Sequence, residues 1–394
     1  MPRLLDELRI VARHGQRIQC RGSSTQGNGT KDKTKNMRIL STSTAFPPHY
    51  FSQQHVVDTL KDYWAEGMEN PAVLERLHMR TGVDGRYFAL PLEQYEQHDT
   101  WGKTNNAWIR VAEELGEKVI DCALRRAKVS REQVGALIFV SVTGISSPSI
   151  DARLVNKMGL NRSVRRMPIF GLGCVAGAAG IARAADYVRA YPDQVAVLLS
   201  VELCSLTWQR GDQSVANLIA SGLFGDGAAA VVIAGSETKL AVESAKAPLG
   251  GPQILASASS FYPDTQDVMG WDISERGFRV VLSPDVPRVI RENLGGDVDR
   301  FLSTQGLTRA EIGSWIMHTG GPKVLEATAE ALGLSNDDFA VSWECLRRMG
   351  NLSSASVLMV LDEVMKNRRP AAGTYSILAA MGPGFCAELV LLRW

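Results

Sequence analysis

The sequence predicts an α/β fold in which two similar halves share one layered core. From about residue 107, helical patterns alternate with short apolar runs, which is typical of layered α/β folds. Two pairs of segments also resemble each other, 129–144 with 307–321 and 173–189 with 350–366. Because both matches occur in the same order at nearly the same offset, they indicate a duplicated α/β unit. A solenoid would repeat at a much shorter period.

The predicted strands of the first half follow from apolar runs between turn signals. The first strand is MRILSTSTAFPP, which starts at Met37, and a buried strand follows in segment 129–144. The Gly- and Ala-rich segment 173–189 is predicted to be a helix. The runs VAVLLSVE and GAAAVVIAG then supply the last two strands of this half, which we assign to residues 37–236.

The second half, residues 237–394, repeats this order. SWIMH is predicted to be a strand, segment 350–366 a helix, and YSILAAMG and CAELVLLRW the closing strands. In an alignment without gaps, Asn351 falls opposite Cys174, each at the start of its helix. Since the halves are related by pseudo-symmetry, we expect these two helix starts to face each other near the centre.

Residues 1–36 differ from the rest of the chain. The stretch RGSSTQGNGTKDKTKN is polar and rich in turn formers, which predicts a disordered N-terminal extension. A secretory signal is not expected, because no continuous apolar segment and no small-residue cleavage site are found there. Met37, which opens the first strand, is therefore a candidate start of the functional protein.

Composition and charge exclude several classes of function. The formal net charge is +1, so no overall field recruits nucleic acid or an anionic membrane. The longest apolar runs are too short to insert into a bilayer. The six cysteines are scattered without CxxC spacing, which predicts a reduced, cytoplasmic protein with no metal site and no disulfide framework.

Three residues are candidates for catalysis. Cys174 lies among small residues at a helix start, where the helix dipole favours a thiolate. His318 ends a strand and is the last of six histidines, the other five lying at residue 98 or before. Each residue taken singly has an ordinary structural interpretation: a buried thiol, a core histidine, and for Asn351 a helix N-cap. Together they predict a nucleophilic cysteine with a base and an amide donor.

Four segments, in this order, resemble the thiolase superfamily and within it the type III polyketide synthases (chalcone synthase-like enzymes): GLGCVAGAAG, MHTGGPKVL, GNLSSASVLMVLDE and MGPGF. The similarity extends from about Met37 to Trp394. It implies a thiolase-like fold with αβαβα layers and a catalytic triad of Cys174, His318 and Asn351. A ketoacyl-ACP synthase III, which makes a single condensation, is the alternative, although such enzymes typically follow the histidine with Gln-Ala-Asn.

The resemblance also implies the chemistry. The Cys174 thiolate, paired with a protonated His318, takes the starter acyl group from its CoA thioester. His318 and Asn351 then donate hydrogen bonds to the malonyl thioester carbonyl, where decarboxylation places negative charge. The resulting carbanion attacks the acyl-Cys174 carbonyl, the step repeats, and the chain cyclises. No cofactor is expected, because the CoA thioesters are substrates.

Further positions follow from the same resemblance. Phe224 and Phe278 match the gatekeepers between the CoA tunnel and the cavity, and Arg76 and Arg80 match basic positions near the CoA phosphates. The cavity positions fall on Thr143, Ser147, Glu202, Cys204, Thr207 and Ser353. A homodimer that does not insert into membranes is expected from the family.

Departures from the plant enzymes narrow the class of starter substrate that we expect. Plant chalcone synthases carry Gly-Phe-Gly-Pro-Gly where this chain has AMGPG, and they have threonine at Cys204 and methionine at Ser147. TGISSPSIDARL (143–154) resembles bacterial members that accept fatty acyl starters. The predicted reaction is the extension of an acyl-CoA starter of this class by malonyl-CoA to an alkylpyrone or alkylresorcinol.

A Cys/His hydrolase and an inactive scaffold are the remaining alternatives for the function. No hydrolase signature surrounds Cys174, which counts against the hydrolase.

Overall fold

Nine strands form the main sheet of the computed structural model, which describes residues 37–64, 71–209, 211–247 and 249–394. The predicted extension, residues 1–36, lies outside the described residues. The strand order is β11-β12-β13-β8-β1-β7-β6-β4-β5. The bounds are β1 Arg38–Ala45, β4 Val134–Val140, β5 Arg165–Ile169, β6 Val195–Leu203, β7 Asp226–Ala234, β8 Gln253–Phe261, β11 Ile312–Met317, β12 Tyr375–Gly382 and β13 Cys386–Arg393.

The pairing of these strands shows the duplication. In one half, β1 pairs antiparallel with β7, β7 antiparallel with β6, and β6 parallel with β4. In the other, β8, β13, β12 and β11 pair in the same order with the same directions. The halves join where Ile39 N donates to Pro252 O at 3.0 Å and Ile254 N donates to Met37 O at 3.1 Å. The predicted α/β duplication is therefore confirmed, with both halves in one continuous sheet.

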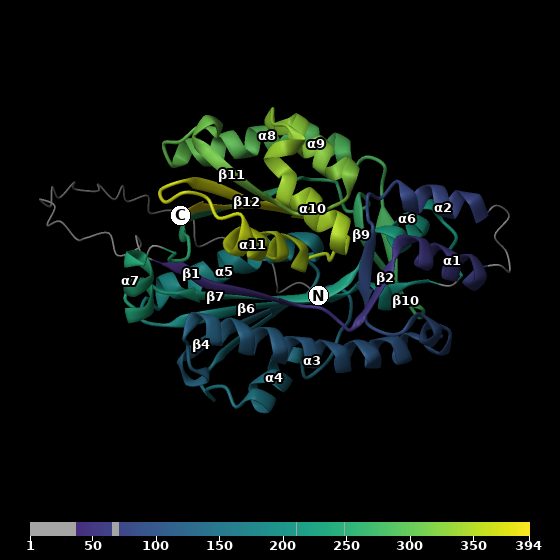
Figure 1. Cartoon of the computed structure of the whole chain (residues 1–394), viewed down its shortest axis with the longest axis horizontal. Helices are drawn as coiled ribbons and strands as arrows, with labels where there is room; N and C mark the ends of the chain where they lie inside the picture. The colour runs from purple at the N-terminus through teal and green to yellow at the C-terminus, as the bar shows by residue number, and fades with distance from the viewer. Residues whose placement is uncertain (1–36, 65–70, 210, 248) are drawn as a thin grey trace, which may run out of the picture. The chain divides into compact units, whose positions relative to one another are not determined.

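The helices and the two halves of the sheet form five layers (Figure 1). The helices α5 (Ala176–Ala190) and α11 (Ala355–Asn367) occupy the middle layer, where each packs against strands of both halves. Outer helices share apolar cores with each half, α3 (Trp101–Ala127) and α4 (Ile150–Met158) on one side, α8 (Val286–Thr304) and α9 (Pro322–Leu332) on the other. This is the predicted αβαβα arrangement.

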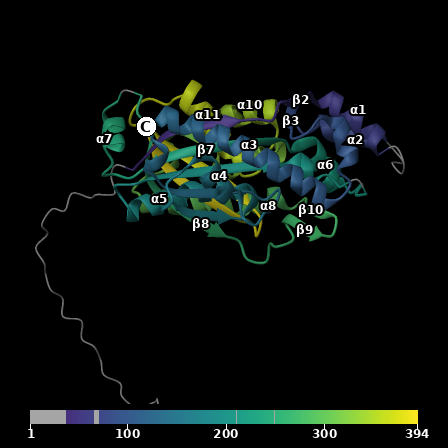
Figure 2. The ribbon, with the colours of Figure 1, turned by 90° about the horizontal axis from the view of Figure 1, so that it is seen from below.

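The remaining elements gather mainly around one end of the strands. There α6 packs against both α2 and β10, and Figure 2 shows these three elements at the same end. Among the described residues, none of the helices combines the length and apolar character needed to span a bilayer. The bounds are β2 His49–Ser52, α1 Gln53–Tyr63, α2 Pro71–Met79, β3 Gly85–Phe88, α6 Val215–Leu223, α7 Lys239–Lys246, β9 Met269–Ser274, β10 Gly277–Leu282 and α10 Ala340–Met349.

Candidate active site

Cys174 is buried in a short 3-10 turn, Gly173–Val175, directly before α5. Its Sγ lies 3.6 Å from Ser353 Oγ, a residue of the loop that precedes α11. Burial raises the pKa of the Cys174 thiol to about 12, and the nearby hydrogen-bond donors lower it by less. Removal from water is the largest effect on this pKa, and a lowering by the helix start stays a prediction.

His318 follows β11 and is fixed through its backbone, since its N–H donates to Ala379 O of β12 at 3.0 Å. The ring is buried, and its Nδ1 has no hydrogen-bond partner among the described residues. Burial lowers the pKa of His318 to about 4. Burial thus opposes the charged form of both the thiol and the imidazole. The thiolate–imidazolium ion pair of the two residues stays a prediction.

Asn351 lies beside Cys174, as predicted, but it is not a helix N-cap. Ser354 holds the cap position of α11, and Asn351 precedes it in an extended segment. Its Oδ1 accepts hydrogen bonds from Ser353 N at 2.8 Å and Ser356 Oγ at 3.3 Å. The Asn351 amide also lowers the pKa of Cys174 by hydrogen bonding, the smallest of the effects on this thiol.

A buried carboxylate connects this loop to the first half of the chain. Glu202 accepts from Thr143 Oγ1 at 2.8 Å and Val142 N at 3.1 Å, and its other oxygen accepts from Ser354 Oγ. Burial raises the pKa of Glu202 despite these bonds. Glu202 therefore acts as a structural link between the turn after β4 and the start of α11.

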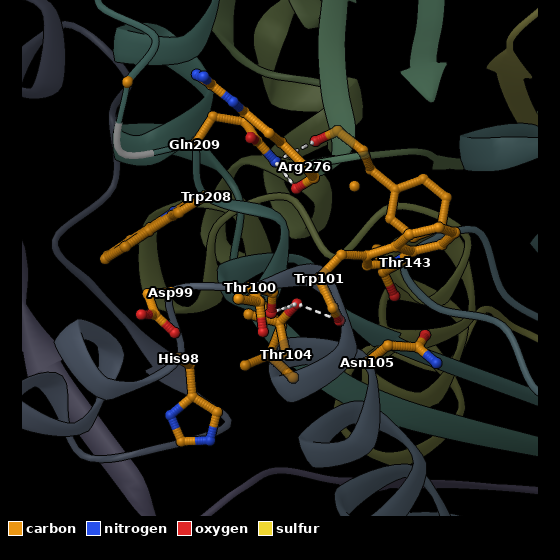
Figure 3. A pocket seen from close by; sticks show the side chains of 14 residues that line it. His98, Asp99, Thr100, Trp101, Thr104, Asn105, Thr143, Trp208, Gln209 and Arg276 are labelled. Carbon is orange, nitrogen blue, oxygen red and sulfur yellow. Dashed lines mark hydrogen bonds between the residues drawn. The ribbon is translucent and has the colours of Figure 1, made fainter. Parts of the chain in front are cut away.

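A cavity of about 240 Å3 lies on the other side of Thr143 (Figure 3). Its wall includes Thr143, a predicted cavity position, and Phe278, a predicted gatekeeper. Trp101, Leu206 and Trp208 add apolar surface, but most of the remaining wall is polar. The polar side chains come from the start of α3, the segment after β6 and the β9–β10 hairpin: His98, Asp99, Thr100, Thr104, Asn105, Gln209 and Arg276. Sequence reasoning missed this group, because residues 98–105 show only a helix-start signal. Cys174, His318 and Asn351 do not line this cavity.

The two predicted gatekeepers lie on neighbouring elements. Phe224 is half-buried at the end of α6 and forms a bridge with Asn351. Phe278 is buried on β10, with its ring centroid 5.9 Å from that of Trp101 and 6.0 Å from that of Trp271. Since α6 packs against β10, both phenylalanines lie near the region between Asn351 and the cavity.

The other predicted positions are more dispersed. Cys204 and Thr207 are buried in one 3-10 turn, where Thr207 Oγ1 donates to Cys204 O at 2.7 Å. Ser147 is exposed before Pro148 and lies outside the cavity, because the chain turns outward there toward α4. Arg76 and Arg80 are exposed on α2 and just after it, and no ion pair engages either of them in the described part of the chain.

Known proteins match this chain over most of its length. The N-terminal domain of chalcone and stilbene synthases matches residues 24–237, which begins inside the predicted extension, and the C-terminal domain matches residues 253–394. A 1,3,6,8-tetrahydroxynaphthalene synthase of Streptomyces peucetius subsp. caesius is 46% identical over 371 residues, 94% of this chain and 97% of that protein.

Solved structures agree. The crystal structure of 1,3,6,8-tetrahydroxynaphthalene synthase from Streptomyces coelicolor A3(2), a bacterial type III polyketide synthase, has a TM-score of 0.83 at 30% identity, covering 91% of this chain and 99% of that one. A polyketide synthase of the brown alga Ectocarpus siliculosus has a TM-score of 0.84 at 27% identity, covering 92% and 99%. The two-domain match and the full-length similarity show that the chain belongs to the chalcone and stilbene synthase family and is a type III polyketide synthase.

Proposed function

We propose that this chain builds a hydroxylated aromatic ring system from malonyl-CoA on Cys174, as the name of its Streptomyces peucetius relative indicates for that protein. The observation that carries the chemistry is the contact of the Cys174 sulfur with Ser353 and Asn351, contributed by opposite halves of the fold. Two loops that precede buried helices are thereby brought to one point, which is the geometry a nucleophile and an oxyanion donor require.

The proposed steps assign one task to each residue. The Cys174 sulfur attacks the thioester carbonyl of the starter, and the CoA thiolate leaves with a proton. Malonyl-CoA then loses CO2, and the electron pair of the broken bond moves onto its thioester oxygen, which Asn351 and His318 stabilise by hydrogen bonding. The carbanion attacks the acyl-Cys174 carbonyl, and the Cys174 thiolate leaves. The lengthened thioester returns to Cys174 for the next round.

The cavity wall supports a polar product. A tetrahydroxynaphthalene has hydroxyl groups at alternate ring positions and no side chain, so its poly-β-ketone precursor is polar along its whole length. Thr100 and Arg276, which line this cavity, carry polar groups suited to such a chain. A fatty acyl starter, with an alkylpyrone or alkylresorcinol product, stays a prediction from the sequence; these polar side chains favour it less.

Product analysis tests the proposal. The enzyme is incubated with malonyl-CoA, with and without a fatty acyl-CoA, and products are identified by mass spectrometry. We expect an aromatic polyketide from malonyl-CoA without any other starter, lost in Cys174→Ala and kept in the matched control Cys122→Ala. A product that carries the alkyl chain would support the fatty acyl alternative. A single β-ketoacyl product would overturn the iterative reaction.

We also propose that Arg76 and Arg80 bind the CoA phosphates and that the enzyme is a homodimer. Both arginines are exposed and without a carboxylate partner among the described residues, Arg76 on α2 and Arg80 just after it, and α2 packs against α6. For the dimer, support comes from β5, the edge strand of the sheet, which ends next to Phe170, 44% exposed. Sedimentation analysis tests the dimer. The cytoplasmic location stays a prediction.

A further inference from the structure

One fully buried arginine has no role in the chemistry described above. Arg86 lies on β3, completely removed from solvent, and no carboxylate lies within ion-pair distance of it among the described residues. Burial lowers the pKa of Arg86 to about 9, and the charge of nearby Asp226 opposes this shift. Arg86 therefore remains charged at pH 7. A buried cation without a direct ion pair needs other acceptors to offset its desolvation.

Those acceptors are the last carbonyl groups of α6. Arg86 Nη1 donates to Gly222 O at 2.9 Å and to Gln53 Oε1, and Nη2 donates to Ser221 O. Gln53 in turn donates to Gly222 O at 2.8 Å. The C-terminal carbonyls of a helix lack partners within the helix and carry partial negative charge. Arg86 thus satisfies the end of α6 both by hydrogen bonding and by charge.

The next carbonyl of the same helix holds Asn351. Asn351 N donates to Leu223 O at 2.9 Å, and Gly225 N donates back to Asn351 O at 2.9 Å. Three consecutive carbonyls, at residues 221–223, are thus divided between Arg86 and Asn351. The helix end that Arg86 fixes is also the one that sets the backbone of Asn351 and, through the Phe224 bridge, that of a gatekeeper.

The arginine side chain also packs under this segment. Gly350, directly before Asn351, has a φ of +74°, and a Cβ there would lie 2.5 Å from Leu223 O and 3.5 Å from Arg86 Cδ. A Cβ on Gly225 would lie 3.2 Å from Arg86 Cβ. The aliphatic part of the Arg86 side chain therefore packs against both chain segments that form the Phe224–Asn351 bridge.

We infer that Arg86 is a positioning residue for the reaction: it holds the end of α6 so that the Asn351 amide keeps its place beside the Cys174 sulfur. This rests on the proposed function, in which Asn351 stabilises charge on the malonyl thioester oxygen. Loss of Arg86 removes the side-chain donor to the Ser221 carbonyl and one of the donors to the Gly222 carbonyl, so the end of α6 is held less firmly and the Asn351 backbone shifts with it. We then expect the rate of decarboxylation to fall. The reactivity of Cys174 should stay the same, because Arg86 does not contact Cys174.

The test measures the rate of decarboxylation and the reactivity of Cys174 separately. Arg86→Gln and Arg86→Lys are made in the full chain, with Arg189→Gln, an exposed arginine on α5, as control. Conversion of malonyl-CoA to acetyl-CoA measures decarboxylation, and iodoacetamide alkylation measures Cys174. We expect decarboxylation kcat to fall on the order of 100-fold in Arg86→Gln and about tenfold in Arg86→Lys, with KM within about twofold. Alkylation at pH 7 should change by less than about twofold.

A double-mutant cycle tests whether Arg86 acts through Asn351. In an Asn351→Ala background, Arg86→Gln should have no further effect on the residual decarboxylation. An equal further loss there would overturn the inference, as would a parallel fall in alkylation or a failure of Arg86→Lys to fold, since each indicates a merely structural role. If the wild type decarboxylates malonyl-CoA and the Arg86 variants do so at the same rate, this inference is wrong but the proposed function is not affected. If the wild type does not decarboxylate malonyl-CoA, the proposed function is wrong as well.

Discussion

At the scale of single residues, burial opposes charge on both the thiol and the imidazole, so a thiolate at this site depends on a partner that offsets the lost hydration. Burial raises the pKa of Cys174 to about 12 and lowers that of His318 to about 4, because each group loses the water that would solvate its charged form. For reaction near pH 7, the thiolate needs a positive partner close by. We propose His318 for this role; its Nδ1 is buried without a hydrogen-bond partner in the described residues.

The first prediction concerns Cys174 reactivity against pH. With His318 replaced by Ala, the thiol should keep the raised pKa that burial imposes, so the thiolate fraction rises about tenfold per pH unit below that pKa. We expect alkylation of His318→Ala by iodoacetamide to be on the order of 100-fold slower than wild type at pH 7 and to rise steeply to pH 9. Wild type should be nearly flat; an equally steep wild-type profile would contradict the His318 role.

The second prediction concerns the two exposed arginines. Replacing Arg76 and Arg80 by Gln should raise the KM for malonyl-CoA, because charge-assisted bonds to phosphate groups distant from the reacting carbon contribute to binding rather than to chemistry. We expect an increase of about tenfold for the double variant, with kcat within about twofold. A lower kcat at unchanged KM would place these residues outside the CoA site. Steady-state kinetics in low and high salt provide the measurement.

At the scale of elements, the site depends on how closely α5 and α11 approach. A Cβ on Gly177, in the first turn of α5, would overlap Ser354 O at the start of α11. Ser354 Oγ also donates to Glu202, and Ser353 contacts Cys174, so this crossing fixes the distance between the loops that carry Cys174 and Asn351. A small residue at Gly177 is therefore needed for the contact between the two helices.

The third prediction compares two glycines in helices. Gly177→Ala should destabilise the protein by about 1–3 kcal/mol, because the methyl group meets a backbone carbonyl that cannot rotate away. Gly102→Ala in α3, where a Cβ would meet nothing within 4 Å, should instead stabilise by about 0.5 kcal/mol. Urea unfolding of both variants provides the comparison. Equal effects of the two substitutions would show that the α5–α11 crossing is looser than the structure has it.

Much of this arrangement follows from the sequence, because the duplication specifies partners that periodicity by itself does not. The strand YSILAAMG is β12 without change, and Cys174 and Asn351 do lie together. What the sequence did not predict depends on distances between segments. Asn351 belongs to a bridge with Phe224 instead of an N-cap, and the polar cavity wall comes from residues 98–105, whose tertiary partners leave no local pattern.

At the scale of the whole molecule, the halves are not independent folding units. The middle apolar core takes Ile181 and Val231 from the first half and Leu358 and Val390 from the second. The sheet is also continuous from β8 to β1. Either half in isolation would expose one buried helix and one face of its sheet, an apolar surface far larger than soluble monomers usually tolerate.

The last prediction follows from this shared core. We expect the full chain to unfold in urea in one transition, with tryptophan fluorescence and far-UV circular dichroism coinciding, since Trp108 and Trp315 report on the two outer cores and both cores border the shared one. Residues 37–236 and 237–394 expressed separately should each be insoluble or unfolded, and co-expression should restore some soluble complex. Two separated transitions, or a folded isolated half, would mean that each half can be stable without the middle layer. In that case the Cys174–Asn351 contact would depend on docking of two domains, and its strength would vary with conditions that leave each half folded.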